Sequence, residues 1–113
     1  MRVLVGDTGP LLHLCESDLL WILNKAGNVH VPSVVVRELK EQTPTSLSAW
    51  IIVSELSSSE EKEAKRLMLS GMLDAGEAGA ICLAQRLRPD WFLTDDTAAR
   101  IFAKSLGMEA HGS

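Results

Sequence analysis

The stretch WFLTDDTAARIFAKSLG, residues 91–107, joins an apolar run to a helical pattern through two adjacent aspartates. Residues 91–96 have strand character, and the residues that follow have the apolar spacing of a helix closed by Gly107. Asp95 and Asp96 repel each other, so a helix N-terminus, an ion pair, solvent or a bound cation must offset that cost. A strand that leads directly into a helix is the repeating unit of α/β proteins.

The same unit recurs along the chain. RVLVGD, residues 2–7, predicts a buried strand of the parallel-sheet type, and short strands are also predicted at 28–32 and 50–56. The helical patterns lie between them, at residues 11–27, 33–42, 57–71 and 74–88. We expect Ser17 or Asp18 to cap a second helix within the first pattern, and Ser58 with Glu61 to form a capping box in the third.

Alternation of strands and helices predicts a mainly parallel sheet covered on both faces, a three-layer α/β/α sandwich. We expect one domain over residues 1–113. The last residues, MEAHGS, resemble the start of a fifth strand. This predicts either a very short edge strand or a chain truncated at that edge.

Composition narrows the class of protein. The chain of 113 residues is 46% hydrophobic and has no apolar run near the roughly 18–20 residues of a membrane span. Its first residues make a poor signal peptide, and Cys15 and Cys82 lack metal-type spacing, so we expect reduced cysteines in a cytoplasmic protein. The net charge of −4 argues against a broad basic face for nucleic acid but does not exclude a nuclease.

Acidic residues follow the first and fourth predicted strands. Asp7 ends the first strand, and Asp95 and Asp96 end the fourth. Ligands of parallel sheets bind beyond the carboxyl ends of the strands, so these carboxylates converge if the two strands are neighbours. Glu38 and Glu77 lie on apolar helix faces, where a charged side chain is seldom left unpaired.

Each of these acids except Asp7 also has a purely structural interpretation; a lone Asp after a buried strand, with no charge partner nearby in the sequence, is more often functional than structural. Asp74 and Glu77 fit a capping box, and Glu38 fits a solvated helix face. One of Asp95 and Asp96 fits the N-cap of the following helix. Four acids at one sheet edge, however, could not all stay ionised without a cation. Mg²⁺ or Mn²⁺ accepts such oxygen ligands and supports phosphodiester hydrolysis.

Four segments together resemble the PIN-domain family, in particular its small prokaryotic members related to VapC-type toxins. They are LVGDTGPLLHL, VPSVVVRELK, LDAGEAGAICLA and FLTDDTAARIFAKSLG, in this order over nearly the whole chain. The resemblance implies an α/β/α sandwich and a metal-dependent ribonuclease site that acts on RNA. It also implies a homodimer and an antitoxin protein as partner. The lack of a long apolar run predicts no membrane association.

The resemblance assigns the site residue by residue. Asp7, Glu38, Glu77 and Asp96 match the family's acids, although position 77 more often holds Asp. Thr94 and Thr8 match supporting hydroxyls. Spacing from Glu77 points instead to Asp95 as the fourth metal ligand; the Thr-x-Asp pattern favours Asp96, with Asp95 as cap or outer acid.

Two other functions remain open. A catalytically degenerate PIN-like domain would serve as a protein-interaction or RNA-binding module, and the acidic net charge favours it. A phospho-acceptor receiver domain would need an acidic pair after the first strand, where this chain has only Asp7.

Overall fold

The computed structural model describes residues 2–43 and 48–112, in which five strands alternate with six helices. The strands are β1 (Arg2–Gly6), β2 (Gly27–Pro32), β3 (Ile52–Ser54), β4 (Trp91–Leu93) and β5 (Ala110–His111). The helices are α1 (Thr8–Glu16), α2 (Trp21–Ala26), α3 (Ser33–Gln42), α4 (Ser58–Leu69), α5 (Ala75–Leu87) and α6 (Thr97–Ser105).

All five strands are parallel and lie in the order β3-β2-β1-β4-β5. The chain builds β1, β2 and β3 outward in one direction and then crosses back through α4 and α5 to add β4 and β5 on the other side of β1. The strand order therefore reverses between β1 and β4, and parallel sheets bind ligands at such a switch point.

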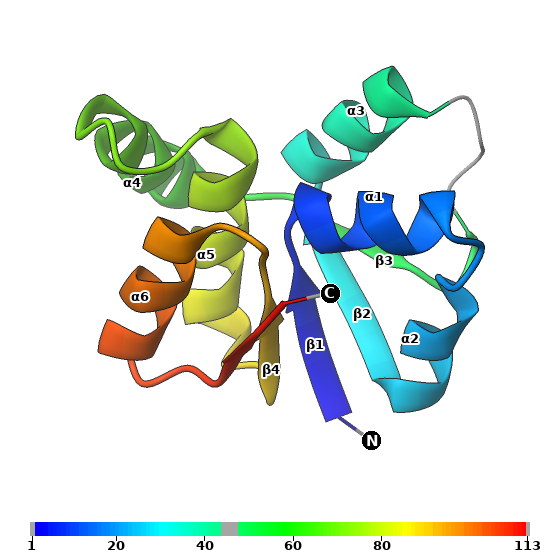
Figure 1. The fold of residues 1–113 in the computed structure, drawn as a ribbon. Helices are drawn as coiled ribbons and strands as arrows, with labels where there is room; N and C mark the ends of the chain where they lie inside the picture. The colour runs from blue at the N-terminus through cyan, green and yellow to red at the C-terminus, as the bar shows by residue number, and fades with distance from the viewer. Residues whose placement is uncertain (1, 44–47, 113) are drawn as a thin grey trace.

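The helices cover both faces of the sheet. Helices α1, α2 and α3 lie on one side, and α4, α5 and α6 lie on the other, with the strands between them (Figure 1). One core cluster joins Leu4 to side chains of the first three helices, and a second joins Val5 and Phe92 to the last three. The predicted three-layer α/β/α sandwich is confirmed.

Small residues let α5 lie at the centre of the molecule. Eight of its residues are buried, mostly Gly and Ala, and it packs against α4, α3 and the sheet. A Cβ added to Gly79 would come 2.7 Å from Cγ1 of Val34 on α3. Glycine at this position therefore sets how closely α3 approaches α5.

The structure corrects several predicted boundaries. The predicted strand at 50–56 is shortened to β3, and the one at 91–96 ends at Leu93 because the chain turns there toward the next helix. The capping box of α4 is formed by Ser57 and Glu60, one residue earlier than predicted, because Ser57 is the residue with extended backbone.

The start of α2 also differs from the prediction. Its N-cap is Leu20, which makes no side-chain hydrogen bond, so neither Ser17 nor Asp18 caps it. Asp18 instead has a positive φ of 58°, in the turn that joins α1 to α2. The predicted fifth strand is present as β5, which pairs with β4.

Both cysteines are free thiols, with Cys82 buried. Among the helices of the described ranges, none is both long and apolar enough to cross a membrane.

Candidate active site

The first strand delivers Asp7 to the switch point of the sheet. β1 and β4 are hydrogen-bonded neighbours, and the Asp7 N–H extends their pairing by donating to the Leu93 carbonyl at 2.9 Å. Two apolar, buried strands thus place the carboxyl end of β1 directly beside that of β4. The convergence that the sequence predicted for these two strands is present.

Asp7 is buried, with 4% of its surface exposed, and its carboxylate is held on both sides. Oδ1 accepts a hydrogen bond from the Thr8 N–H at 2.7 Å, as the N-cap of α1. Oδ2 accepts one from Oγ1 of Thr94 at 3.1 Å, and Thr94 is fully buried. These two bonds fix the carboxylate in one orientation toward the sheet edge.

Glu38 reaches the same edge from α3. Its Oε1 accepts a hydrogen bond from Oγ1 of Thr8. The Cβ that any other residue would place at Gly76 would lie 2.1 Å from this Oε1. Gly76, in the first turn of α5, is therefore the gap into which the Glu38 carboxylate fits.

Glu77 lies in a capping box at the start of α5. Its Oε1 accepts from the Asp74 N–H at 2.8 Å, and Oδ1 of Asp74 accepts from the Glu77 N–H at 2.8 Å. The structural interpretation of this pair is confirmed, but it does not remove Glu77 from the site. Oε2 of Glu77 makes no hydrogen bond within the described part of the chain.

The two aspartates after β4 have different partners. Oδ2 of Asp96 accepts from the Ala99 N–H at 2.8 Å, so Asp96 is the N-cap of α6. Oδ2 of Asp95 lies 2.8 Å from Nδ1 of His13 on α1. The expectation that Asp95 is the cap is wrong, because Asp96, not Asp95, is the residue immediately before the first turn of α6.

These acids line one cavity of about 390 Å³. All five candidate acids, Asp7, Glu38, Glu77, Asp95 and Asp96, contribute to it, together with Thr8 and Gly9. Three further polar side chains were not assigned to the site from the sequence: Glu41, Gln42 and Asp74. Glu41 follows Glu38 by three residues on α3, and this helical spacing is the signal that could have found it.

Burial and mutual repulsion disfavour the ionised forms of two of these acids. Burial is the largest influence and raises the pKa of Asp7 to about 6, with Asp74 and Glu38 adding to the rise. Burial likewise raises the pKa of Glu77 to about 7, and the charges of Asp74, Asp7 and Asp96 act in the same direction. Like-charge repulsion, the effect expected from the sequence, is present but smaller than desolvation.

Comparison with known protein families gives a match that covers nearly the whole chain. Residues 3–113 match a protein-family model described as a PIN domain. The chain belongs to the PIN-domain family. The PIN domain is a nuclease-type family, and its members typically use divalent metals. A search of curated protein sequences found no match.

The donor set suits a hard divalent cation, but the side chains are not gathered around one point. The cavity offers oxygen ligands, which Mg²⁺ and Mn²⁺ prefer. Within residues 2–43 and 48–112, however, no three His, Cys, Asp or Glu side chains are close enough together to hold a metal ion. An ion in this cavity would therefore require some of its carboxylates to lie closer together than they do here.

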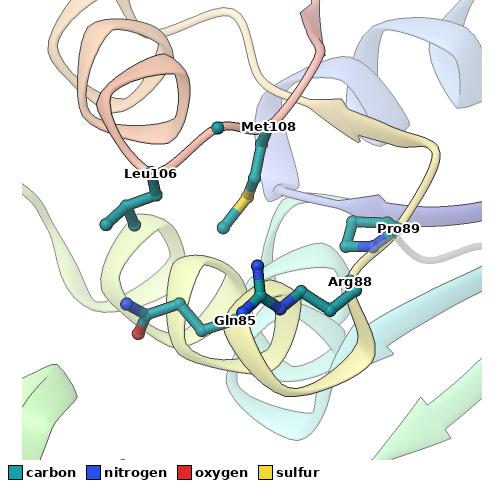
Figure 2. Close-up of a pocket in the computed structure, with 6 residues that line it drawn as sticks. Gln85, Arg88, Pro89, Leu106 and Met108 are labelled. Atoms are coloured by element: carbon teal, nitrogen blue, oxygen red, sulfur yellow. The ribbon is translucent and has the colours of Figure 1, made fainter.

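A second cavity, of about 260 Å³, lies at the opposite end of the sheet, where the chain enters β4 and β5 (Figure 2). Its lining is Gln85, Arg88, Pro89, Leu106, Gly107 and Met108. Among the described residues, this lining contains no carboxylate.

Proposed function

We propose that this protein is a divalent-metal-dependent endoribonuclease that hydrolyses RNA phosphodiesters. One observation carries the proposal: a buried carboxylate, Asp7, lies at the switch point of a PIN-domain sheet, in a cavity shared with Glu38, Glu77 and Asp96. Burial raises the pKa of Asp7 to about 6, so a nearby cation would stabilise the charged form of this carboxylate.

In this proposal Asp7, Glu38, Glu77 and Asp96 hold Mg²⁺ or Mn²⁺, with Asp95 at the rim. The bound cation would stabilise the negative charge on the phosphate and lower the pKa of a water molecule. Thr94 and Thr8 keep Asp7 and Glu38 oriented through their hydroxyl hydrogen bonds. The capping bonds of Glu77 and Asp96 each use one carboxylate oxygen, which leaves Oε2 and Oδ1 for the cation.

Asp7→Asn tests the proposal. Asn keeps the size of the side chain and its capping bond but removes the charge, so cleavage of RNA in Mg²⁺ or Mn²⁺ should be lost by at least about a hundredfold. Asp90→Asn is the matched control, because Asp90 is an exposed aspartate at the opposite end of the sheet that accepts from the Val3 N–H. Equal cleavage by Asp7→Asn and by the unmodified protein would overturn the proposal.

The resemblance to VapC-type toxins supports two extensions: a role as the toxin of a toxin–antitoxin pair, and a homodimer. A short reading frame that overlaps or directly precedes this gene would support an antitoxin partner. Sedimentation of the purified chain would test the dimer.

The second candidate is a degenerate PIN-like domain that binds RNA or protein without cleaving. The structural bonds of Asp7, Glu77 and Asp96 favour it, because the carboxylate of each already accepts a backbone hydrogen bond at a helix N-terminus. Calorimetric titration with Mn²⁺ separates the two candidates. Saturable binding that is lost in Asp7→Asn supports the nuclease, and no saturable binding supports the degenerate domain.

A further inference from the structure

A groove of about 490 Å³ lies beside the acid cavity, between α3 and α4. Its lining includes Ala75 and Gly79 of α5, which lie on either side of Gly76 and Glu77 in the chain. Helix α3 separates the two depressions: Val34 and Arg37 line the groove, and Glu38 and Glu41 line the cavity. A polymer that lies in the groove therefore needs to cross only this helix to reach the acids.

The groove is basic although the protein is acidic. Arg37, Lys62 and Lys65 line it, against one acid, Glu61. All three cations are exposed, and none has a carboxylate within 4.0 Å among the described residues. The arginines that do form ion pairs, Arg66 and Arg86, are not part of this lining.

The rest of the lining is small or apolar. Val34, Leu56 and Met68 contribute to it, and Met68 is 40% exposed. Such surface accommodates the aliphatic stems of Lys and Arg and the sugar faces of a polynucleotide. None of the lining residues is aromatic, so the groove offers cations for phosphates rather than stacking platforms for bases.

We propose that the groove between α3 and α4 binds the backbone of single-stranded RNA. Arg37, Lys62 and Lys65 would each neutralise one phosphate of the segment that leads to the acid cavity. This proposal rests on the proposed function, because it takes the substrate from that site. The substrate is specified as a single strand because Asp7 is buried at the base of the cavity. A flexible strand can bend its backbone into a recess, whereas the stacked backbone of a duplex stays on its surface.

Binding should be measured in the Asp7→Asn background, where no cleavage competes, with a fluorescein-labelled single-stranded RNA of mixed sequence in Mg²⁺. Each phosphate contact contributes about 0.7 to the slope of log K against log salt for single strands. Replacing all three cations by Gln should reduce that slope by about 2 and weaken binding roughly a hundredfold at 0.1 M salt. Each single replacement should weaken binding about fivefold.

Two controls each change one charge. Lys104→Gln removes one exposed cation from the last turn of α6, outside the groove, and should leave the salt slope unchanged. Glu61→Gln removes the only acid of the groove lining and should tighten binding. Far-UV circular dichroism and thermal unfolding confirm that each variant is folded.

The proposal would be overturned if the triple variant had the same RNA affinity and the same salt slope as Lys104→Gln. Duplex RNA bound as tightly as the single strand would also overturn it, as would an acidic peptide bound in the groove with no RNA binding. With Asp7 intact, the triple variant should raise KM and leave kcat unchanged. RNA binding in the groove without cleavage by the unmodified protein would support this proposal while the proposed function fails.

Discussion

The two ends of the parallel sheet hold cavities of similar kind but opposite chemistry. At the carboxyl ends of the strands, a cavity of about 390 Å³ is lined by carboxylates, and Asp7 at its base is buried. At the amino ends, a cavity of about 260 Å³ is lined by Arg88, Gln85 and apolar side chains. Asp90, an aspartate at that end, is exposed and accepts a hydrogen bond from the Val3 N–H.

The difference shows where the fold gives up stability. At the amino end, every polar group described above is exposed or hydrogen-bonded in the ordinary way. At the carboxyl end, burial and, to a smaller extent, neighbouring carboxylates raise the pKa of Asp7 and Glu77. The charged forms of these two acids are therefore less stable in the folded protein than in the unfolded chain. Proteins keep such costly arrangements mainly where they bind or react.

The largest expected effect on stability comes from Asp7→Asn. The pKa of Asp7 is about 6 in the folded protein and 3.8 ordinarily, a difference that corresponds to about 3 kcal/mol. Between these values the folded state holds a proton that the unfolded chain has lost, so the free energy of unfolding falls as pH rises from about 4 to about 6. Above pH 6, Asp7→Asn should raise that free energy by up to about 3 kcal/mol.

Urea unfolding at pH 4 and pH 7.5 measures this effect. The advantage of Asp7→Asn should be present at pH 7.5 and should largely vanish at pH 4, where the folded state carries the proton and the unfolded chain, with a pKa of 3.8, carries it in part. Asp90→Asn, at the other end of the sheet, should change stability by less than about 0.5 kcal/mol at either pH. An Asp7→Asn protein less stable than the unmodified one at pH 7.5 would contradict the assigned cost of burial.

Gly76→Ala should give the next largest effect. The new Cβ would lie 2.1 Å from Oε1 of Glu38, so the carboxylate must leave its position beside Thr8. Displacing a residue that positions a catalytic group typically costs tenfold to a hundredfold in activity. The RNA cleavage rate of the purified variant measures the loss.

Gly79→Ala is the matched control on the same helix. Its Cβ would crowd Cγ1 of Val34 at 2.7 Å, an apolar contact outside the acid cavity. It should lower stability by about 1–3 kcal/mol and reduce cleavage much less than Gly76→Ala does. If the two variants lose cleavage activity equally, the loss comes from altered helix packing rather than from displacement of the Glu38 carboxylate.

Asp96 and Asp95 should differ by a smaller amount. Asp96→Ala removes the N-cap of α6 and should cost about 1 kcal/mol of stability, whereas Asp96→Asn keeps the cap and should cost little. Asp95→Ala removes the contact with His13, whose side chain is 60% exposed, so its cost should stay below about 0.5 kcal/mol. Thermal unfolding of the three variants ranks their stability costs. A larger cost for Asp95→Ala than for Asp96→Ala would contradict the assignment of Asp96 as the N-cap.

The fold and the position of the candidate site could be predicted from local patterns. Apolar runs that end at Asp7 and just before Asp95 identify buried parallel strands, and parallel strands bring their ends to one edge. The capping box of Asp74 and Glu77 was also visible, because it depends only on residues three apart.

Contacts between distant segments could not be predicted in this way. The bond from Thr8 to Glu38 spans 30 residues, and the fit of that carboxylate against Gly76 depends on the distance between α3 and α5. The choice between Asp95 and Asp96 as cap depended on the residue at which β4 ends. A pattern of apolar residues locates such a boundary only to within a few positions.

A small gain in stability, rather than a loss, is expected at the amino end from Arg88→Gly. Arg88 ends α5 with φ 52° and ψ 61°, a left-handed conformation that glycine adopts without steric cost. The substitution should raise stability by about 0.5–1 kcal/mol and leave RNA cleavage unchanged, because the cavity that Arg88 lines holds no carboxylate. Urea unfolding and the cleavage assay test both parts, with Gly107→Ala, at φ 83°, as the opposite change at the same end. Loss of cleavage in Arg88→Gly would mean that the amino end shares in the reaction, and the contrast between the two ends would no longer hold.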